Sequence, residues 1–309
     1  MTSSAENLRI DIDRLLERLA DLAAIGAIEG TEGSARLALT DEDKAGRDLV
    51  VAAMKDLDLD ITIDGIGNVV AVMPGATSGP PVMCGSHIDT VRTGGRYDGN
   101  LGVLAGLEII EVVKAAGLTP HRPLAVAFFT DEEGARFAPD MLGSLVYVGG
   151  MALEDALAIE GIDGAIVGPE LKRIGYDGTS PLPASPPYAF VELHIEQGPV
   201  LEAEGITIGA VESVQGISWQ EVTVTGQSNH AGTTPMNLRK DPGSWRQLVR
   251  TLPVRWPLNS ALHKSPRSGG SNCAPTSSTS CPHRQPSPST YATPTKRFFR
   301  SPRTASPSS

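Results

Sequence analysis

GSHIDTVRTGGRYDGNLG, residues 85–102, is rich in glycine and carries His87, Asp89 and Asp98 but few large apolar side chains. A short apolar run precedes it, and an apolar helical pattern opens at Gly102. This composition predicts a loop that leaves a strand and enters a helix, rather than a core element. In α/β proteins, functional side chains favour this position at the carboxyl end of a strand.

The flanking sequence alternates between strand and helix patterns. Apolar residues recur at three- and four-residue steps from Glu6 to Ala24, which predicts an amphipathic helix. Thr40 and Asp43 have the spacing of a capping box, so we expect a second helix from Thr40 to about Leu57. Further predicted elements are strands at 61–63, 69–73, 82–84, 124–129 and 188–194, and a helix at 99–116. We therefore expect an α/β fold with a mixed or mostly parallel sheet covered by helices.

Changes in this pattern indicate domain boundaries. Proline, glycine and serine are dense in residues 169–187, which indicates a surface connection. Short β patterns then follow one another at 208–214 and 219–225, so we expect a first domain at 1–212 and a second at 213–241.

Charge is distributed unevenly along the chain. Residues 1–241 carry 16 Lys and Arg against 36 Asp and Glu, whereas residues 242–309 carry 10 basic residues and no acid. The latter segment also holds 11 Pro and 14 Ser in 68 residues, so we expect it to be disordered. This composition is typical of an out-of-frame reading of a GC-rich gene. Its basic residues lack interleaved aromatics, and we expect no nucleic-acid partner.

The three cysteines, Cys84, Cys273 and Cys281, have no CxxC spacing, which favours a reducing compartment. The first 16 residues include acids and lack the apolar core of a signal peptide. No apolar run approaches the roughly 18 residues of a membrane span. We therefore expect a cytoplasmic protein with no membrane partner.

Histidines and acids follow the predicted strands, in four groups: His87 with Asp89 and Asp98, Glu132 with Glu133, His194 with Glu196, and His230. Imidazole and carboxylate are ligands for divalent zinc, cobalt, manganese or nickel, and a carboxylate can bridge two ions. Two such ions polarise a carbonyl and lower the pKa of a water. Of two adjacent glutamates, one can then ligate while the other acts as a base.

Each group alone has an ordinary structural explanation. A single histidine is more often a hydrogen-bonded structural residue, and an isolated Glu132–Glu133 pair is more often solvated. Asp131 is interpreted as a capping or solvated residue, and Cys84 as a small packing residue of its strand. The shared placement of the four groups after strands favours a metal site.

Five motifs make the pattern specific. In order they are GSHIDT, YDGNLGV, DEEGARF, ELHIEQGP and SNHAGTTPM. Together they resemble the peptidase M20-type amidohydrolases over about residues 6–241, and most closely the N-carbamoyl-L-amino acid hydrolase branch, which includes allantoate amidohydrolase and β-ureidopropionase. The resemblance implies a zinc-peptidase-like α/β catalytic domain interrupted by a smaller αβ lid domain that also forms a homodimer.

The resemblance also implies roles for individual residues. His87, bridging Asp98 and His194 are similar to the ligands of one metal ion, and Asp98 and Glu133 to ligands of a second. Glu132 is similar to the general base and Asp89 to the carboxylate that orients the ring of His87. His230 resembles the lid residue that reaches a partner subunit's active site to stabilise the oxyanion. We expect His230 and the adjacent Asn229 to contact substrate.

The sequence departs from the family pattern after Asp241. A late histidine completes the second metal site in the family, and residues 242–309 offer no matching context, so the second site is expected to be incomplete. The expected function is hydrolysis of linear C–N bonds in a small ureido or carbamoyl compound, foremost an N-carbamoyl-L-amino acid. The alternatives are allantoate amidohydrolase or β-ureidopropionase and, from another class, an inactive metal-binding fragment.

Overall fold

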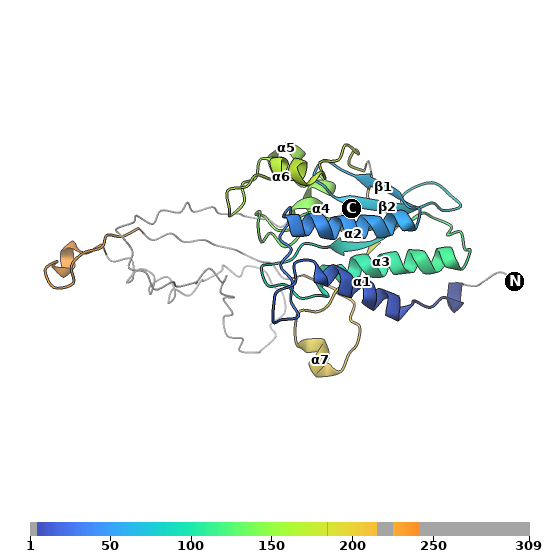
Figure 1. The fold of residues 1–309 in the computed structure, drawn as a ribbon, viewed down its shortest axis with the longest axis horizontal. Coiled ribbons are helices and arrows are strands. Elements are labelled where there is room, and N and C mark those ends of the chain that lie inside the picture. The colour runs from blue at the N-terminus through green and yellow to red at the C-terminus, as the bar shows by residue number, and fades with distance from the viewer. Residues whose placement is uncertain (1–4, 184, 215–224, 241–309) are drawn as a thin grey trace, which may run out of the picture. The chain divides into compact units, whose positions relative to one another are not determined.

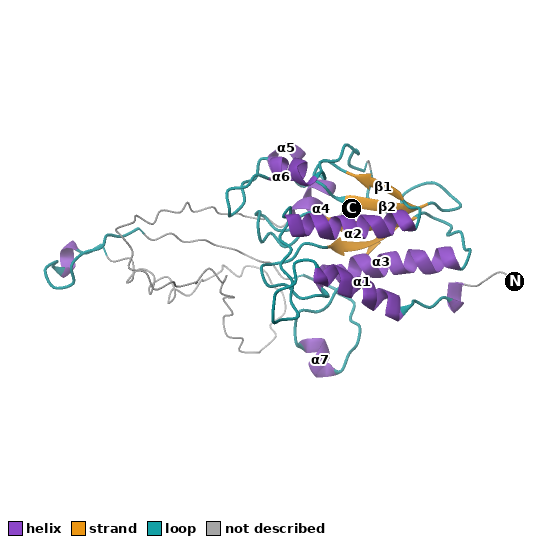
Figure 2. Ribbon diagram, in the orientation of Figure 1, coloured by secondary structure: helices purple, strands orange, loops and turns teal. Residues whose placement is uncertain are grey.

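The computed structural model describes residues 5–183, 185–214 and 225–240. Its contacts divide the chain into one unit that ends at Gly209 and another that begins at Ala210. The first unit contains a five-stranded sheet with helices packed against it (Figures 1 and 2). None of the helices in the described part of the chain is long and apolar enough to cross a bilayer.

The sheet is mixed, as the sequence predicts. Its strands are β1 (Asp60–Ile63), β2 (Val69–Met73), β3 (Val82–His87), β4 (Leu124–Phe129) and β5 (Ala189–Val191), in the spatial order β1-β2-β4-β3-β5. The β1–β2 and β2–β4 pairs are antiparallel, whereas β3 pairs in parallel with both β4 and β5. The carboxyl ends of β3, β4 and β5 therefore meet at one edge of the sheet.

The helices of the first unit are α1 (Ile12–Ala24), α2 (Asp41–Asp56), α3 (Asp98–Ala115), α4 (Leu142–Tyr147), α5 (Leu153–Leu157), α6 (Val167–Ile174) and α7 (Val200–Glu204). Short 3-10 turns lie at Ala5–Asn7 and, in the second unit, at Met236–Leu238. The Thr40 hydroxyl accepts the Asp43 N–H at 3.2 Å, which confirms the predicted start of α2.

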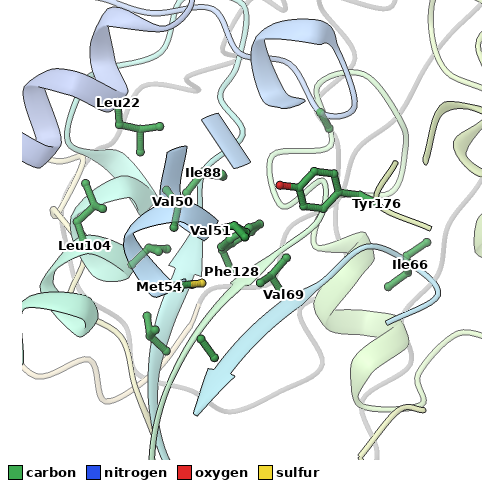
Figure 3. Close-up of a cluster of buried hydrophobic side chains, with 14 of the residues drawn as sticks. Leu22, Val50, Val51, Met54, Ile66, Val69, Ile88, Leu104, Phe128 and Tyr176 are labelled. Carbon is green, nitrogen blue, oxygen red and sulfur yellow. The ribbon is translucent and has the colours of Figure 1, made fainter. Parts of the chain in front are cut away.

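The main core joins α1, α2 and α3 to the sheet. Leu22, Met54, Leu104 and Phe128 are buried together there (Figure 3). A second, smaller cluster consists of Met83, Ala125 and Ala127. Burying apolar side chains contributes about 1.5–3 kcal/mol for each large residue, so these contacts hold the strand ends in place.

Four expectations about elements differ from the structure. Residues 85–102 are not a loop throughout, because β3 continues to His87 and α3 begins at Asp98, and both residues are buried. Part of the predicted surface connection forms α6, which ends at Ile174. The described residues 208–214 contain no strand, and the strand at 188–194 is only Ala189–Val191. Residues 219–224 and 242–309, for which we predicted a strand and a disordered tail, lie outside the described residues.

Candidate metal centre

His87, Asp98 and His194 come together at the carboxyl edge of the sheet. His87 is the last residue of β3, Asp98 is the first residue of α3, and His194 follows β5. Each offers one ligand atom, and these three atoms lie within 4.8 Å of one another. The structure thus places three predicted ligands within reach of one ion.

Both histidine rings are held so that their Nε2 atoms are free to ligate. The Nδ1 atom of His87 lies 2.9 Å from the Asp89 carbonyl oxygen, and that of His194 lies 2.8 Å from the Ile195 carbonyl oxygen. A carbonyl oxygen can only accept, so each Nδ1 carries a proton, and in the neutral form of each ring Nε2 presents a lone pair. Hydrogen bonds of this kind fix the ring orientation of metal-ligating histidines.

Asp98 is buried at the start of α3 and lies between other polar groups. Its Oδ1 atom is 3.4 Å from His194 Nε2 and accepts a hydrogen bond of 2.7 Å from the side-chain N–H of Gln197. Gln197 has a φ of 53°, in the left-handed region that a non-glycine residue rarely adopts. Our sequence interpretation missed Gln197, although it lies in the ELHIEQGP motif.

Asp89 joins the β3 segment to the turn after β4. Its two carboxylate oxygens accept the backbone N–H groups of Glu132 and Glu133, each at 3.2 Å. The Oδ1 atom of Asp89 lies 3.7 Å from His87 Nδ1. Asp89 therefore fixes the backbone of the two glutamates while it lies beside the histidine ring.

Glu132 and Glu133 present their side chains to the same group of residues. Glu132 Oε2 is 3.3 Å from His87 Nε2. Burial raises the pKa of Glu132, with His87 opposing and Asp89 adding to the rise. Burial and then the Asp98 carboxylate raise the pKa of Glu133 to about 8. Neighbouring carboxylates repel one another when all are ionised, and a bound cation would offset this repulsion.

The interpretation of Asp131 as a capping or solvated residue was wrong. Asp131 is fully buried, with a φ of 53°. Neither carboxylate oxygen accepts a hydrogen bond of normal geometry among the described residues, although the backbone N–H of Phe137 lies near enough to oppose the rise in the Asp131 pKa. Burial raises the pKa of Asp131 well above its ordinary value, and Asp89 adds to the rise. The turn after β4 directs Asp131 inward, whereas Glu132 and Glu133 remain half-buried.

The segment after β5 is exposed but is tied to the site. Its Glu192 carboxylate accepts a hydrogen bond from the hydroxyl of the buried Ser86, next to His87. Glu196, which we had grouped with His194, uses its two oxygens to accept the N–H groups of Val200 and Leu201 at the start of α7. The structure thus gives Glu196 a capping role and Glu192 a link to β3.

His230 and Asn229 lie in the second unit. The His230 Nδ1 atom accepts backbone N–H groups from Gly232 at 3.1 Å and Thr233 at 3.2 Å, so its Nε2 atom carries the proton. The Asn229 side chain donates to the Gln227 carbonyl oxygen at 3.3 Å. The side chain of His230 is exposed and presents an N–H donor.

With this geometry described, comparisons identify the family. Residues 83–291 match the family described as Peptidase family M20/M25/M40. The chain belongs to this family. The match continues beyond residue 241, where we expected the resemblance to end.

Individual M20 relatives agree with this assignment. An N-carbamoyl-L-amino-acid amidohydrolase of Rhizobium meliloti is 43% identical over 245 residues, which are 79% of this chain and 58% of that protein. An allantoate deiminase of Arabidopsis thaliana is 39% identical over 210 residues, 63% of this chain and 38% of that protein. The crystal structure of a hydantoinase/carbamoylase family amidase from Burkholderia vietnamiensis has a TM-score of 0.75 and 45% identity, and the match covers 79% of this chain and 59% of that chain. This M20 chain thus spans less than two thirds of the length of each of these relatives.

Proposed function

We propose that this M20 chain carries the first metal site and the base of a metal-dependent amidohydrolase for N-carbamoyl-L-amino acids. The observation that carries the proposal is the convergence of His87, Asp98 and His194 within 4.8 Å, with Glu132 Oε2 3.3 Å from His87 Nε2. The Rhizobium relative supports the substrate class, and the half-buried acids beside the histidines support a cation.

The donor set fits a divalent ion such as zinc, manganese, cobalt or nickel. Two neutral imidazoles and a carboxylate are ligands that these ions accept. We assign His87, Asp98 and His194 to a first ion, and Asp98 with Glu133 to a second. The second ion has only these two proposed ligands among the described residues. When bound, divalent ions polarise the scissile carbonyl and lower the pKa of the attacking water.

Glu132 is the proposed general base. Its carboxylate reaches the histidine cluster while its backbone is fixed by Asp89, so the side chain has a defined position. Burial raises its pKa above the ordinary value for glutamate, which brings this pKa closer to neutral pH and makes the carboxylate a better proton acceptor. Glu132 would take a proton from water as the C–N bond is attacked and deliver it to the departing nitrogen.

His230 is the proposed oxyanion donor, with Asn229 beside it as a substrate contact. The protonated Nε2 atom of His230 is the chemical form that this role requires, because an oxyanion accepts hydrogen bonds. In the proposed assembly, a homodimer, this group serves the partner subunit. The dimer and the cytoplasmic location stay predictions.

Three small ureido compounds are candidate substrates for this chain, with an N-carbamoyl-L-amino acid first. The similarity to the Arabidopsis allantoate deiminase makes allantoate the second candidate substrate for this chain, and 3-ureidopropionate is the third. A purified chain supplied with Co²⁺ or Mn²⁺ is tested on N-carbamoyl-L-methionine, allantoate and 3-ureidopropionate, with ammonia and free amino acid measured. We expect weak turnover that is highest on the carbamoyl amino acid. Metal binding without turnover of any of the three would identify an inactive metal-binding fragment.

A further inference from the structure

Arg36 is a fully buried cation that contacts residues next to His87 and Asp98 in the sequence. Its guanidinium donates to carbonyl oxygens of Leu22 at 3.0 Å, Ile25 at 2.9 Å and Ile88 at 2.8 Å, and to the side-chain oxygen of Asn100 at 3.0 Å. It forms no ion pair within 4.0 Å among the described residues. Burying an arginine without a paired carboxylate costs free energy, and these four oxygen acceptors must offset that cost. We therefore asked which segments supply them.

Two of the four acceptors belong to the segments that carry the ligands. Ile88 lies between His87 and Asp89, directly after the end of β3, and Asn100 lies in the first turn of α3, two residues after Asp98. A planar guanidinium with diverging donors sets the separation of these two segments more strictly than a single point charge can.

Other contacts hold Arg36 itself in place. Its backbone N–H donates to the Thr90 hydroxyl at 2.7 Å, and its carbonyl accepts the Thr90 N–H at 2.9 Å. Gly46 of α2 leaves space for the side chain, because a Cβ at that position would lie 2.7 Å from Arg36 Cδ. Thr90 therefore holds the Arg36 backbone, and the space beside Gly46 admits its side chain, so that the guanidinium has a defined position next to Ile88 and Asn100.

We propose that Arg36 is a positioning residue of the metal centre, which sets the distance between His87 and Asp98 without touching the ion or the substrate. Arg36 also contacts the carbonyl oxygen of Ile88, the residue before Asp89, and Asp89 accepts the Glu132 and Glu133 N–H groups. Arg36 therefore also aligns the turn that carries the two glutamates. The inference rests on the proposed function, because it requires that His87 and Asp98 share an ion.

The test measures zinc affinity by competition with a chelator, and the absorption spectrum of bound Co²⁺, in the full chain. Arg36→Lys keeps the charge but loses the planar fork, and Asn100→Ala removes one acceptor. Each should weaken zinc binding by about 10–100-fold, the effect typical of groups that orient ligands, and shift the Co²⁺ bands. The control is Met54→Ala, a core variant in α2, a helix that carries none of the proposed ligands and none of the acceptors of Arg36. It destabilises the fold, and its zinc affinity should stay within about threefold of wild type.

The outcomes separate the inference from the function on which it rests. Unchanged affinity and spectrum in Arg36→Lys, or in a folded Asn100→Ala if the lysine variant does not fold, would reduce Arg36 to a structural residue. An equal loss in Met54→Ala would also overturn the inference, because global destabilisation would then explain the effect. Zinc binding that survives His87→Asn would instead reject the metal centre itself, and the role of Arg36 with it.

Discussion

The His87 ring packs directly against Gly99. A Cβ at position 99 would lie 2.2 Å from His87 Cδ2 and 2.4 Å from His87 Nε2, far inside van der Waals contact. Gly99 follows Asp98 in the first turn of α3, so the missing side chain lets the histidine reach the carboxylate. The glycine is therefore part of the geometry of the candidate metal centre.

Gly99→Ala should displace the His87 ring and weaken zinc binding by at least about tenfold, because the new methyl group would overlap the ring of this proposed ligand. Chelator competition measures the loss. Gly95→Ala is the matched control, since a Cβ at position 95 meets nothing within 4 Å. Equal zinc affinity in the two variants would show that the ring can move without cost.

Asp98→Asn and His194→Asn should each abolish tight binding of the first ion. Asp98→Asn removes the carboxylate that faces His194 Nε2 at 3.4 Å, and His194→Asn removes an imidazole ligand. Metal analysis of the dialysed protein gives the stoichiometry. His121→Asn changes an exposed histidine away from these residues and should retain the wild-type metal content. Retention of metal by Asp98→Asn would contradict the assigned ligand set.

The part of this centre that could be predicted from sequence has a physical explanation. β2 and β4 were predicted to the residue, because uninterrupted apolar runs mark strands that are buried in a sheet. His87, Asp98 and His194 could be found because they stand in specific motifs beside such strands. Parallel pairing then brings residues distant in sequence to one edge.

Other features depend on packing that no local pattern encodes. α4 and α5 contain six and five residues, too few to display a helical period. Arg36 and Asp131 are charged residues that a sequence pattern assigns to the surface, yet both are fully buried. The partners of Gln197 and Glu192 appear only once β5 is placed beside β3. The interior contacts of charged groups were therefore the main omission.

Glu132→Gln should lower residual hydrolysis by about 10²–10⁴-fold, because the amide cannot accept the proton from water. Zinc affinity should stay within about threefold, since Glu132 is not an assigned ligand. Initial rates at high protein concentration measure the change, and Glu17→Gln on the exposed face of α1 is the control. A rate unaffected by Glu132→Gln would remove this residue as the base.

The metal-free chain should lose stability as the pH rises from about 5 to 8. The pKa of Glu133 is about 8 in the folded chain, against an ordinary value of 4.5, so the folded state holds a proton that the unfolded state has released. Burial alone would lower the pKa of His87, but Asp89 and Glu132 outweigh it and raise the pKa. A protonated His87 stabilises the fold at low pH, and this stability is also lost as the pH rises.

Urea unfolding with a chelator present, at about pH 6 and about pH 8.5, measures this difference directly. Glu133→Gln should flatten the dependence, because the glutamine has no proton to release. Added zinc should reverse it, since the ligands bind metal only when deprotonated and the bound ion then stabilises the folded state at the higher pH. A metal-free chain that is more stable at the higher pH would contradict the raised pKa values of Glu133 and His87 in the folded state.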